Sequence, residues 1–228
     1  IDELGTPADV VLIYAITGEK NGRPEVSTFI VENGTEGYTV GQKIKDKTGM
    51  RGSNTAELVF ENCKVPLGNL VGAEGDSMHH MMRNLEIERL TLAAMSLGIG
   101  RRSLEVMNQY AKEREAFGKS LSYFGQIQKY IGDSYAEYMA SKTYVYNTAR
   151  VLNLQKGGQR MDSDGTKLVA STMGKNLADR AMQVLGGYGY VGEYHVERLW
   201  RDAKLLEIGG GTIEAHQKNI TRDLSRSL

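Results

Sequence analysis

Glu88 is the residue of this 228-residue sequence whose type and surroundings first point to chemistry. Apolar residues recur around it at every third or fourth position: Met81, Leu85, Leu92, Met95 and Ile99. This spacing predicts one buried face of an α-helix with a single carboxylate on it. A buried carboxylate is either paired with a cation or has a raised pKa, which would suit a general base working near neutral pH. The spacing alone leaves both interpretations open, because structural ion pairs also perturb pKa values.

A run of three glycines, Gly209–Gly211, comes directly before Thr212 and a further stretch of helical sequence. Threonine is a good N-cap residue, and the start of a helix carries unpaired N–H groups and the positive end of the dipole. Because the run has no side chains, a flat or wide ligand can rest against its backbone. A flexible linker is the weaker alternative, since helical sequence closely brackets the glycines.

Another glycine-rich stretch, Gly187–Gly192, has the spacing G-x-G-x-x-G. It follows helical sequence, whereas the dinucleotide-binding fingerprint needs a strand before it and a helix after it, so we reject a Rossmann unit. The stretch Gln183–Gly189 is either a helix end with a turn or a place where backbone approaches a ligand closely. Arg114, at a predicted helix end beside Phe117, is a cation of the type that clamps phosphate.

The elements that must hold these residues change type along the chain. Up to about residue 75 the sequence predicts short β-strands, separated by turn residues, at 10–15, 26–31, 38–42 and 56–61. Beyond it, the sequence predicts helices at 76–113, 122–155, 162–185, 194–206 and 212–226. We therefore expect two domains: residues 1–75 form part of a β domain, and residues 76–228 form an all-α up-down four-helix bundle.

The composition argues against several classes of protein. A formal net charge of +0 gives no electrostatic basis for binding nucleic acid. No apolar run is long enough to span a bilayer. Cys63 is the only cysteine, and the four histidines have no metal-ligand spacing, so we expect neither an internal disulfide nor a metal site. No targeting segment is visible, but the chain begins in strand-like sequence, so this says little about its compartment.

Short motifs, in their order and spacing, resemble the acyl-CoA dehydrogenase family over essentially the whole chain. They lie at Ala8–Val10, Thr28–Glu32, Gly49–Thr55, Glu88–Leu90, Arg114–Gly118, Leu185–Gly187, Arg201–Lys204 and Glu207–Thr212. The resemblance implies a multidomain α and β fold. Residues 1–75 would be the C-terminal part of a small antiparallel β-barrel domain, the family's middle domain, followed by the helical bundle at 76–228.

The resemblance implies FAD-dependent α,β-dehydrogenation of an acyl-CoA thioester, in which a glutamate removes the α-proton and FAD accepts the β-hydrogen as hydride. Most members carry this glutamate at the position matching Gly210, and some branches carry it on the helix matching Glu88. Because Gly210 has no carboxylate, Glu88 is the expected base, and the Gly210 N–H is expected to polarise the thioester carbonyl. Glycines at 209 and 210 leave room for a branched acyl chain, so we expect a short branched-chain acyl-CoA, with isovaleryl-CoA favoured.

Matching the motifs residue by residue implies the binding sites. The expected substrate-binding residues are Glu86, Ile87, Arg89, Gly210 and Gly211. The expected FAD contacts from a neighbouring subunit are Arg114, Gln183, Val184, Leu185, Gly186 and Gly187. The expected contacts to FAD of the same subunit are Thr212 and Glu214, and the remaining cofactor-binding positions are Ala116, Phe117, Gly125 and Ile213. The sequence departs from the family pattern at His79, Gly125 and Ile213.

The resemblance further implies a homotetramer (a dimer of dimers) that passes electrons to an electron-transfer flavoprotein. It implies the mitochondrial matrix in a eukaryote and the cytoplasm in a bacterium. Two alternatives stay open. One is a long-chain or terpenoid acyl-CoA dehydrogenase, which also places its base on this helix. The other is a catalytically silent structural relative, suggested by the departures around the flavin site.

Overall fold

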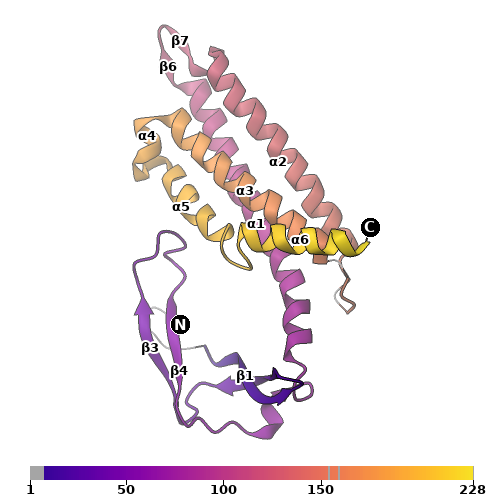
Figure 1. Cartoon of the computed structure of the whole chain (residues 1–228). Coiled ribbons are helices and arrows are strands. Elements are labelled where there is room, and N and C mark those ends of the chain that lie inside the picture. Colours follow the sequence, from indigo (N-terminus) through magenta and orange to yellow (C-terminus); the bar gives the residue numbers. More distant parts are fainter. Residues whose placement is uncertain (1–7, 154, 159, 228) are drawn as a thin grey trace. The chain divides into compact units, whose positions relative to one another are not determined.

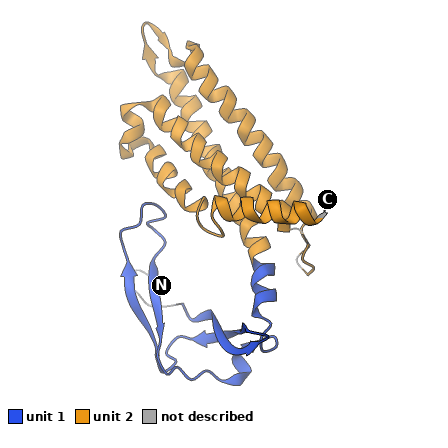
Figure 2. Ribbon diagram, viewed as in Figure 1, with its two compact units in different colours: residues 1–84 blue, residues 85–228 orange. Residues whose placement is uncertain are grey.

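The computed structural model describes residues 8–153, 155–158 and 160–227. Residues 1–7, 154, 159 and 228, which the predicted domains include, lie outside the described residues. The chain divides into two compact units, residues 1–84 and 85–228 (Figure 2). The division falls inside one long helix, α1 (Ser77–Glu113), because this helix begins in the first unit and continues through the second. The domain boundary expected near residue 75 stays a prediction.

The first unit is built from antiparallel strands. Strand β1 (Val10–Lys20) pairs with β2 (Arg23–Glu32), and the short β5 (Leu70–Val71) adds to β2. A separate pair joins β3 (Tyr38–Ile44) to β4 (Thr55–Phe60). The four predicted strands are therefore present. The additional strand β5 has only two residues, which is too short to give a recognisable sequence pattern.

Strand β1 runs to Lys20, five residues beyond its predicted end. Of the turn-forming residues Gly18–Gly22, only Asn21 and Gly22 form the turn, with φ of 54° and 73°. Positive φ at both positions is what a tight hairpin between twisted strands requires, and asparagine and glycine adopt it most easily. One face of β1 carries exposed apolar side chains, with Ile16 at 72% exposure, which fits the expectation that these strands are part of a β domain.

The second unit is helical. It contains most of α1 and the helices α2 (Gly125–Val151), α3 (Arg160–Leu185), α5 (Val196–Leu206) and α6 (Ile213–Ser227). Figure 1 shows α1, α2 and α3 running alongside one another, with α6 crossing the N-terminal part of α3. An ion pair between Arg160 and Asp223 joins these two helices there. The expected order, a β region followed by an all-α region, is confirmed.

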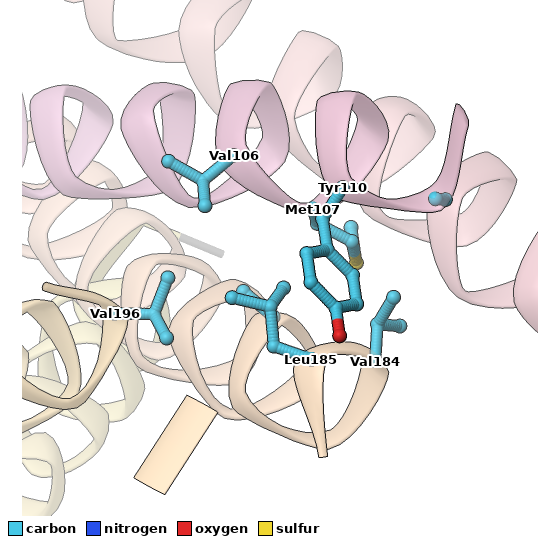
Figure 3. Close-up of a cluster of buried hydrophobic side chains, with 8 residues drawn as sticks. Val106, Met107, Tyr110, Val184, Leu185 and Val196 are labelled. Carbon is cyan, nitrogen blue, oxygen red and sulfur yellow. The ribbon is translucent and has the colours of Figure 1, made fainter. Parts of the chain in front are cut away.

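Two clusters of apolar side chains hold the helices together. One lies where α1, α2 and α3 meet and contains Leu90, Ala93, Leu97, Val145, Ala170, Met173 and Leu177. The other lies at the far ends of α1 and α3, where Tyr110 reaches from α1 towards Val184 and Leu185 (Figure 3). Burial raises the pKa of the Tyr110 hydroxyl.

Several details of the helical unit differ from the prediction. A small hairpin of β6 (Glu115–Ala116) and β7 (Lys119–Ser120) follows α1, and a one-turn helix, α4 (Gly187–Tyr190), follows α3. These elements are two to four residues long, too short for a periodic pattern. Since α4 follows a helix, no strand–turn–helix unit surrounds the G-x-G-x-x-G stretch, and the rejection of a Rossmann unit is confirmed.

Gly100 of α1 and Gly174 of α3 lie where the two helices pack closely together. A Cβ at Gly100 would lie 2.7 Å from the sulfur of Met173 in α3, while a Cβ at Gly98 would meet nothing within 4 Å. From the other side, a Cβ at Gly174 in α3 would lie 2.9 Å from the carbonyl oxygen of Ser96. Two glycines within a helical sequence pattern predict close helix packing. That prediction is confirmed for Gly100 and wrong for Gly98.

We predict that Gly174→Val lowers the free energy of unfolding by about 2–3 kcal/mol, because the new side chain forces α3 away from the α1 backbone. Gly98→Ala is the matched control, with no steric conflict and a gain of roughly 0.5–1 kcal/mol in helix propensity. Urea denaturation of both variants checks this. Equal free energies of unfolding for the two variants would contradict the close contact.

Candidate active site

The loop between α5 and α6 brings Gly210 against Glu88 of α1. A Cβ at Gly210 would lie 3.5 Å from the Glu88 Oε1 atom and 2.6 Å from the Cδ1 atom of Leu92. Gly210 also has a φ of 67°, in the left-handed region that favours glycine. The two residues expected to carry the chemistry are thus adjacent. Glycine is required at 210 for both its backbone angle and the space.

The face of α1 that contains Glu88 is less buried than its apolar spacing predicts. Glu88 itself is partly exposed, and Met95 is 48% exposed. The fully buried side of α1 contains Leu90, Ala93 and Leu97. Apolar residues lie on both sides of this helix, so periodicity could not tell which side packs against the other helices. The face that contains Glu88 is therefore half-buried, with Ile99 buried at one end, and the prediction of a buried face is confirmed only in part.

Two charged residues close to Glu88 in α1 are buried: Glu86 and Arg89, each 6% exposed. Glu86 accepts a hydrogen bond of 3.3 Å from the backbone N–H of Gly158. The Nε atom of Arg89 donates to the carbonyl oxygen of Gly210 at 3.1 Å. Both side chains, expected to bind substrate, thus make contacts inside the protein, and Ile87 between them is partly buried.

The backbone of Gly210 is held on one side and free on the other. Its carbonyl accepts from Arg89, whereas its N–H has no acceptor within residues 8–153, 155–158 and 160–227. An N–H group near a carboxylate, with no protein partner, is available to a ligand carbonyl. The next residue, Gly211, has a φ of 119°, and a Cβ there would lie 3.0 Å from the Cε1 atom of His216.

A cluster of buried polar side chains beneath this loop escaped the sequence analysis. Asp164, Lys167 and His216 are each 0% exposed. The Oδ1 atom of Asp164 lies 2.6 Å from His216 Nδ1 and 3.0 Å from a terminal nitrogen of Arg89. The ammonium of Lys167 donates to the carbonyl oxygen of Leu206, the last residue of α5. The only local indication of this cluster in the sequence is that two charged residues, Asp164 and Lys167, lie one turn apart in a predicted helix.

The second set of expected cofactor residues gathers at the other end of α1 and α3. A pocket of about 530 Å³ is lined by Tyr110, Arg114, Leu121, Val184, Leu185, Gly186, Gly187, Tyr188 and Val191. Five of these were expected to contact FAD, and Gln183 is exposed beside them. Gly186 has a φ of 59°, and a Cβ at Gly186 or Gly187 would meet nothing, so the backbone is open to a ligand. An aromatic and aliphatic wall with one arginine fits a flavin nucleotide with its pyrophosphate.

The remaining expected cofactor residues lie in the β6–β7 hairpin, at the start of α2 and at the start of α6. Phe117 is 95% exposed at the tip of the β6–β7 hairpin, beside Ala116, and Gly125 is exposed at the start of α2. At the start of α6, the Thr212 hydroxyl accepts a hydrogen bond of 3.3 Å from the Ala215 N–H, which confirms Thr212 as the helix cap.

Glu214 belongs to the same first turn of α6. Hydrogen bonds from its own backbone N–H and from the Thr212 hydroxyl lower the pKa of its carboxyl. Ile213 precedes it and is partly buried. The start of α6 thus presents a threonine and an ionised carboxylate next to the triple glycine.

Within the part of the chain that the structure describes, no group of three or more His, Cys, Asp or Glu side chains is placed to hold a metal ion. None of the described helices is long and apolar enough to cross a membrane.

Comparison with known proteins identifies the family. Residues 75–225 match the C-terminal domain of acyl-CoA dehydrogenases, and residues 3–63 match their middle domain. A mitochondrial isovaleryl-CoA dehydrogenase of Arabidopsis thaliana is 43% identical over 220 residues, which is 96% of this chain and 53% of that protein. The chain therefore belongs to the acyl-CoA dehydrogenase family, and it spans about half the length of the curated relatives that it matches.

Solved structures agree with this assignment. Butyryl-CoA dehydrogenase from Megasphaera elsdenii has a TM-score of 0.90 at 36% identity, covering 95% of this chain and 56% of that one. An acyl-CoA dehydrogenase from Bacillus anthracis, solved in complex with FAD, has a TM-score of 0.87 at 27% identity, covering 97% of this chain and 40% of that one. The family is one of oxidoreductases that use FAD, so the expected cofactor is confirmed for the family.

The buried lysine generates a prediction about pH. Burial, together with the nearby charge of Arg89, lowers the pKa of Lys167 to about 8 from its ordinary 10.5. Between these values the folded protein has released this proton and the unfolded chain still holds it, so folding is favoured as the pH rises. We expect the stability of the wild type relative to Lys167→Met to increase between pH 7 and pH 10 by on the order of 2 kcal/mol.

Urea denaturation at the two pH values measures this difference. Lys129→Met, which removes an exposed lysine of α2, is the matched control and should show no such increase. A pH-independent difference between the wild type and Lys167→Met would contradict a buried, charged Lys167.

Proposed function

We propose that the protein of which this chain is part is an FAD-dependent acyl-CoA dehydrogenase that oxidises a short branched-chain acyl-CoA, with isovaleryl-CoA favoured. The observation that carries the proposal is the nearness of Glu88 to Gly210, where an added Cβ would lie 3.5 Å from the Glu88 Oε1 atom. A carboxylate beside a free N–H is the pair of groups that α-proton removal from a thioester needs, one to take the proton and one to stabilise the oxygen as charge develops.

Glu88 is the proton acceptor in this proposal. Its carboxylate lies on a long, rigid helix, so its position does not depend on a mobile loop. The Gly210 N–H donates to the thioester oxygen, which lowers the pKa of the α-carbon and stabilises the enolate-like transition state. Bound FAD supplies the acceptor for the β-hydride.

The two sets of expected cofactor residues support a role for a second copy of the chain. Along α1, Glu88 and the helix end at Glu113 are 25 residues apart, or about 38 Å at ~1.5 Å per residue. This is farther than one extended FAD molecule reaches. Thr212 and Glu214 would therefore contact the FAD beside Glu88. The Arg114 and Gly186 pocket would contact the FAD of a neighbouring subunit, in an assembly that we propose to be a homotetramer.

The substrate is proposed from the family resemblance and from two relatives. The relatives described above carry the names of isovaleryl-CoA and butyryl-CoA, both short acyl chains, which supports a short-chain substrate. An electron-transfer flavoprotein is the proposed electron acceptor, and the compartment is the mitochondrial matrix in a eukaryote or the cytoplasm in a bacterium.

We predict that Glu88→Gln lowers turnover by about 10³-fold or more while FAD stays bound, because the amide cannot accept the α-proton. Exchange of the α-proton with deuterated solvent, together with the flavin absorption spectrum, measures both properties in the full-length protein. Glu105→Gln, which changes an exposed glutamate of the same helix, is the matched control.

Near-normal α-proton exchange in Glu88→Gln would refute the assignment of the base. A wild-type protein that shows no flavin absorbance, even after FAD is added, would instead favour the catalytically silent relative.

A second prediction concerns the acyl chain. We expect kcat/KM to be highest for isovaleryl-CoA, about tenfold lower for butyryl-CoA, which lacks one methyl branch, and lower again for palmitoyl-CoA. Steady-state kinetics on the three thioesters, with one common electron acceptor, decides the order. Faster oxidation of palmitoyl-CoA would replace this proposal with the long-chain alternative.

A further inference from the structure

The triple glycine of the α5–α6 loop needs outside support to hold the Gly210 N–H in a fixed position. Three successive residues without side chains cannot fix their own conformation, and glycine has the largest conformational freedom to lose. Yet the Gly210 N–H has to be held steadily against a thioester oxygen if it is to stabilise the transition state. The Gly209 N–H is held by the carbonyl oxygen of Leu205 at 2.7 Å, so the further restraint on Gly210 and Gly211 has to come from side chains outside the glycine run.

Two side chains hold the loop, one on each side of the Gly210–Gly211 peptide. Arg89 of α1 donates from Nε to the Gly210 carbonyl oxygen at 3.1 Å. His216 of α6 presents its ring edge to Gly211, where a Cβ would lie 3.0 Å from Cε1 and 3.3 Å from Nε2. The loop therefore rests on a guanidinium and an imidazole that belong to two different helices.

One carboxylate of a third helix orients both groups. Asp164 of α3 lies 2.6 Å from His216 Nδ1 and 3.0 Å from a terminal nitrogen of Arg89, through the same oxygen, Oδ1. An ionised carboxylate only accepts hydrogen bonds, so Nδ1 of His216 carries the proton and donates it. Asp164 and His216 are 0% exposed and Arg89 is 6% exposed, so solvent screens these contacts little.

The cluster is a poor way to gain stability. The second oxygen of Asp164 and the Nε2 atom of His216 have no hydrogen-bond partner among the described residues. The Arg89 nitrogen that lies 3.0 Å from Asp164 has none either, so Arg89 and Asp164 form an ion pair without hydrogen-bond geometry. A buried polar atom without a partner is destabilising, and buried ion pairs are often no better than apolar packing of similar volume. What the cluster does accomplish is to fix the orientation of Arg89 and His216, and through them the loop.

We propose that Asp164 and His216 are positioning residues for the dehydrogenation, acting through Arg89 and Gly211 to hold the Gly210 N–H beside Glu88. This rests on the proposed function for its catalytic consequence, though the restraint on the loop does not depend on it. Neither residue is expected to touch substrate or flavin.

The experiment compares Asp164→Asn, His216→Ala and His216→Asn in the full-length, FAD-loaded protein. Asparagine at 216 places its amide nitrogen near the position of Nδ1 and so keeps the donor to Asp164, whereas alanine removes both donor and ring. Asp223→Asn is the matched control, because it breaks another ion pair of α6, that with Arg160, away from the loop.

We expect Asp164→Asn and His216→Ala to lower kcat by about 10- to 100-fold with KM changed less than about threefold, as a misplaced group of order 1 Å would. His216→Asn should recover most of the loss, and Asp223→Asn should keep wild-type kcat. Hydrogen exchange of the peptide amides in 207–212, measured without substrate, should rise by about tenfold in the two damaging variants.

The carbonyl stretch of bound isovaleryl-CoA, labelled with ¹³C at the thioester, isolates the effect on Gly210. It is measured in the Glu88→Gln background, so that the thioester is not consumed. In Asp164→Asn and His216→Ala the frequency should move towards that of the free thioester, since the N–H no longer polarises it.

Unchanged kcat, carbonyl frequency and amide exchange in Asp164→Asn and His216→Ala would overturn the proposal. So would equal losses in His216→Asn and His216→Ala, which would mark a merely structural role. A wild-type protein that binds FAD and does not oxidise acyl-CoA would instead overturn the proposed function, and amide exchange of the loop would still decide whether Asp164 and His216 restrain it.

Discussion

The hydrogen bond from Arg89 to the carbonyl of Gly210 is the contact on which the candidate site depends. It ties a triple glycine, whose residues have no side chains to restrain them, to α1, a helix of 37 residues. Because Arg89 is the residue after Glu88, the same turn of α1 carries the expected base and the anchor of its partner loop. The position of the Gly210 N–H relative to the Glu88 carboxylate is therefore fixed mainly by one hydrogen bond to the residue next to Glu88.

That contact depends in turn on how closely α3 packs against α1. Gly174 lets the backbone of α3 approach that of α1 at Ser96, and Gly100 makes room for the Met173 side chain, so α3 lies near enough for Asp164 to reach Arg89. The apolar cluster of Leu90, Ala93, Met173 and Leu177 excludes water around the same stretch. The close packing of α3 on α1 therefore allows the buried ion pair of Asp164 and Arg89, and Arg89 in turn holds the glycine loop.

Much of the fold could be predicted from the sequence, because helical periodicity and turn residues are local signals. The main helices and the four long strands lie where their patterns indicate, and Thr212 caps α6. The buried face of α1 could not be predicted, since apolar residues lie on both of its sides. Asp164 and His216, 52 positions apart, meet only in the folded chain, and no local pattern links an aspartate in one helix to a histidine in another.

Glu88 and Gly210 also exclude an alternative arrangement of the site. A side chain at 210 would start 2.6 Å from the Cδ1 atom of Leu92 and 3.5 Å from the Glu88 Oε1 atom, so it would displace Leu92 and bring a second carboxylate into the neighbourhood of the first. A nearby like charge disfavours the ionised form of a carboxyl group. A base on the loop and a base on the helix are therefore unfavourable together. A glycine at 210 is the counterpart of a glutamate at 88 rather than an independent feature.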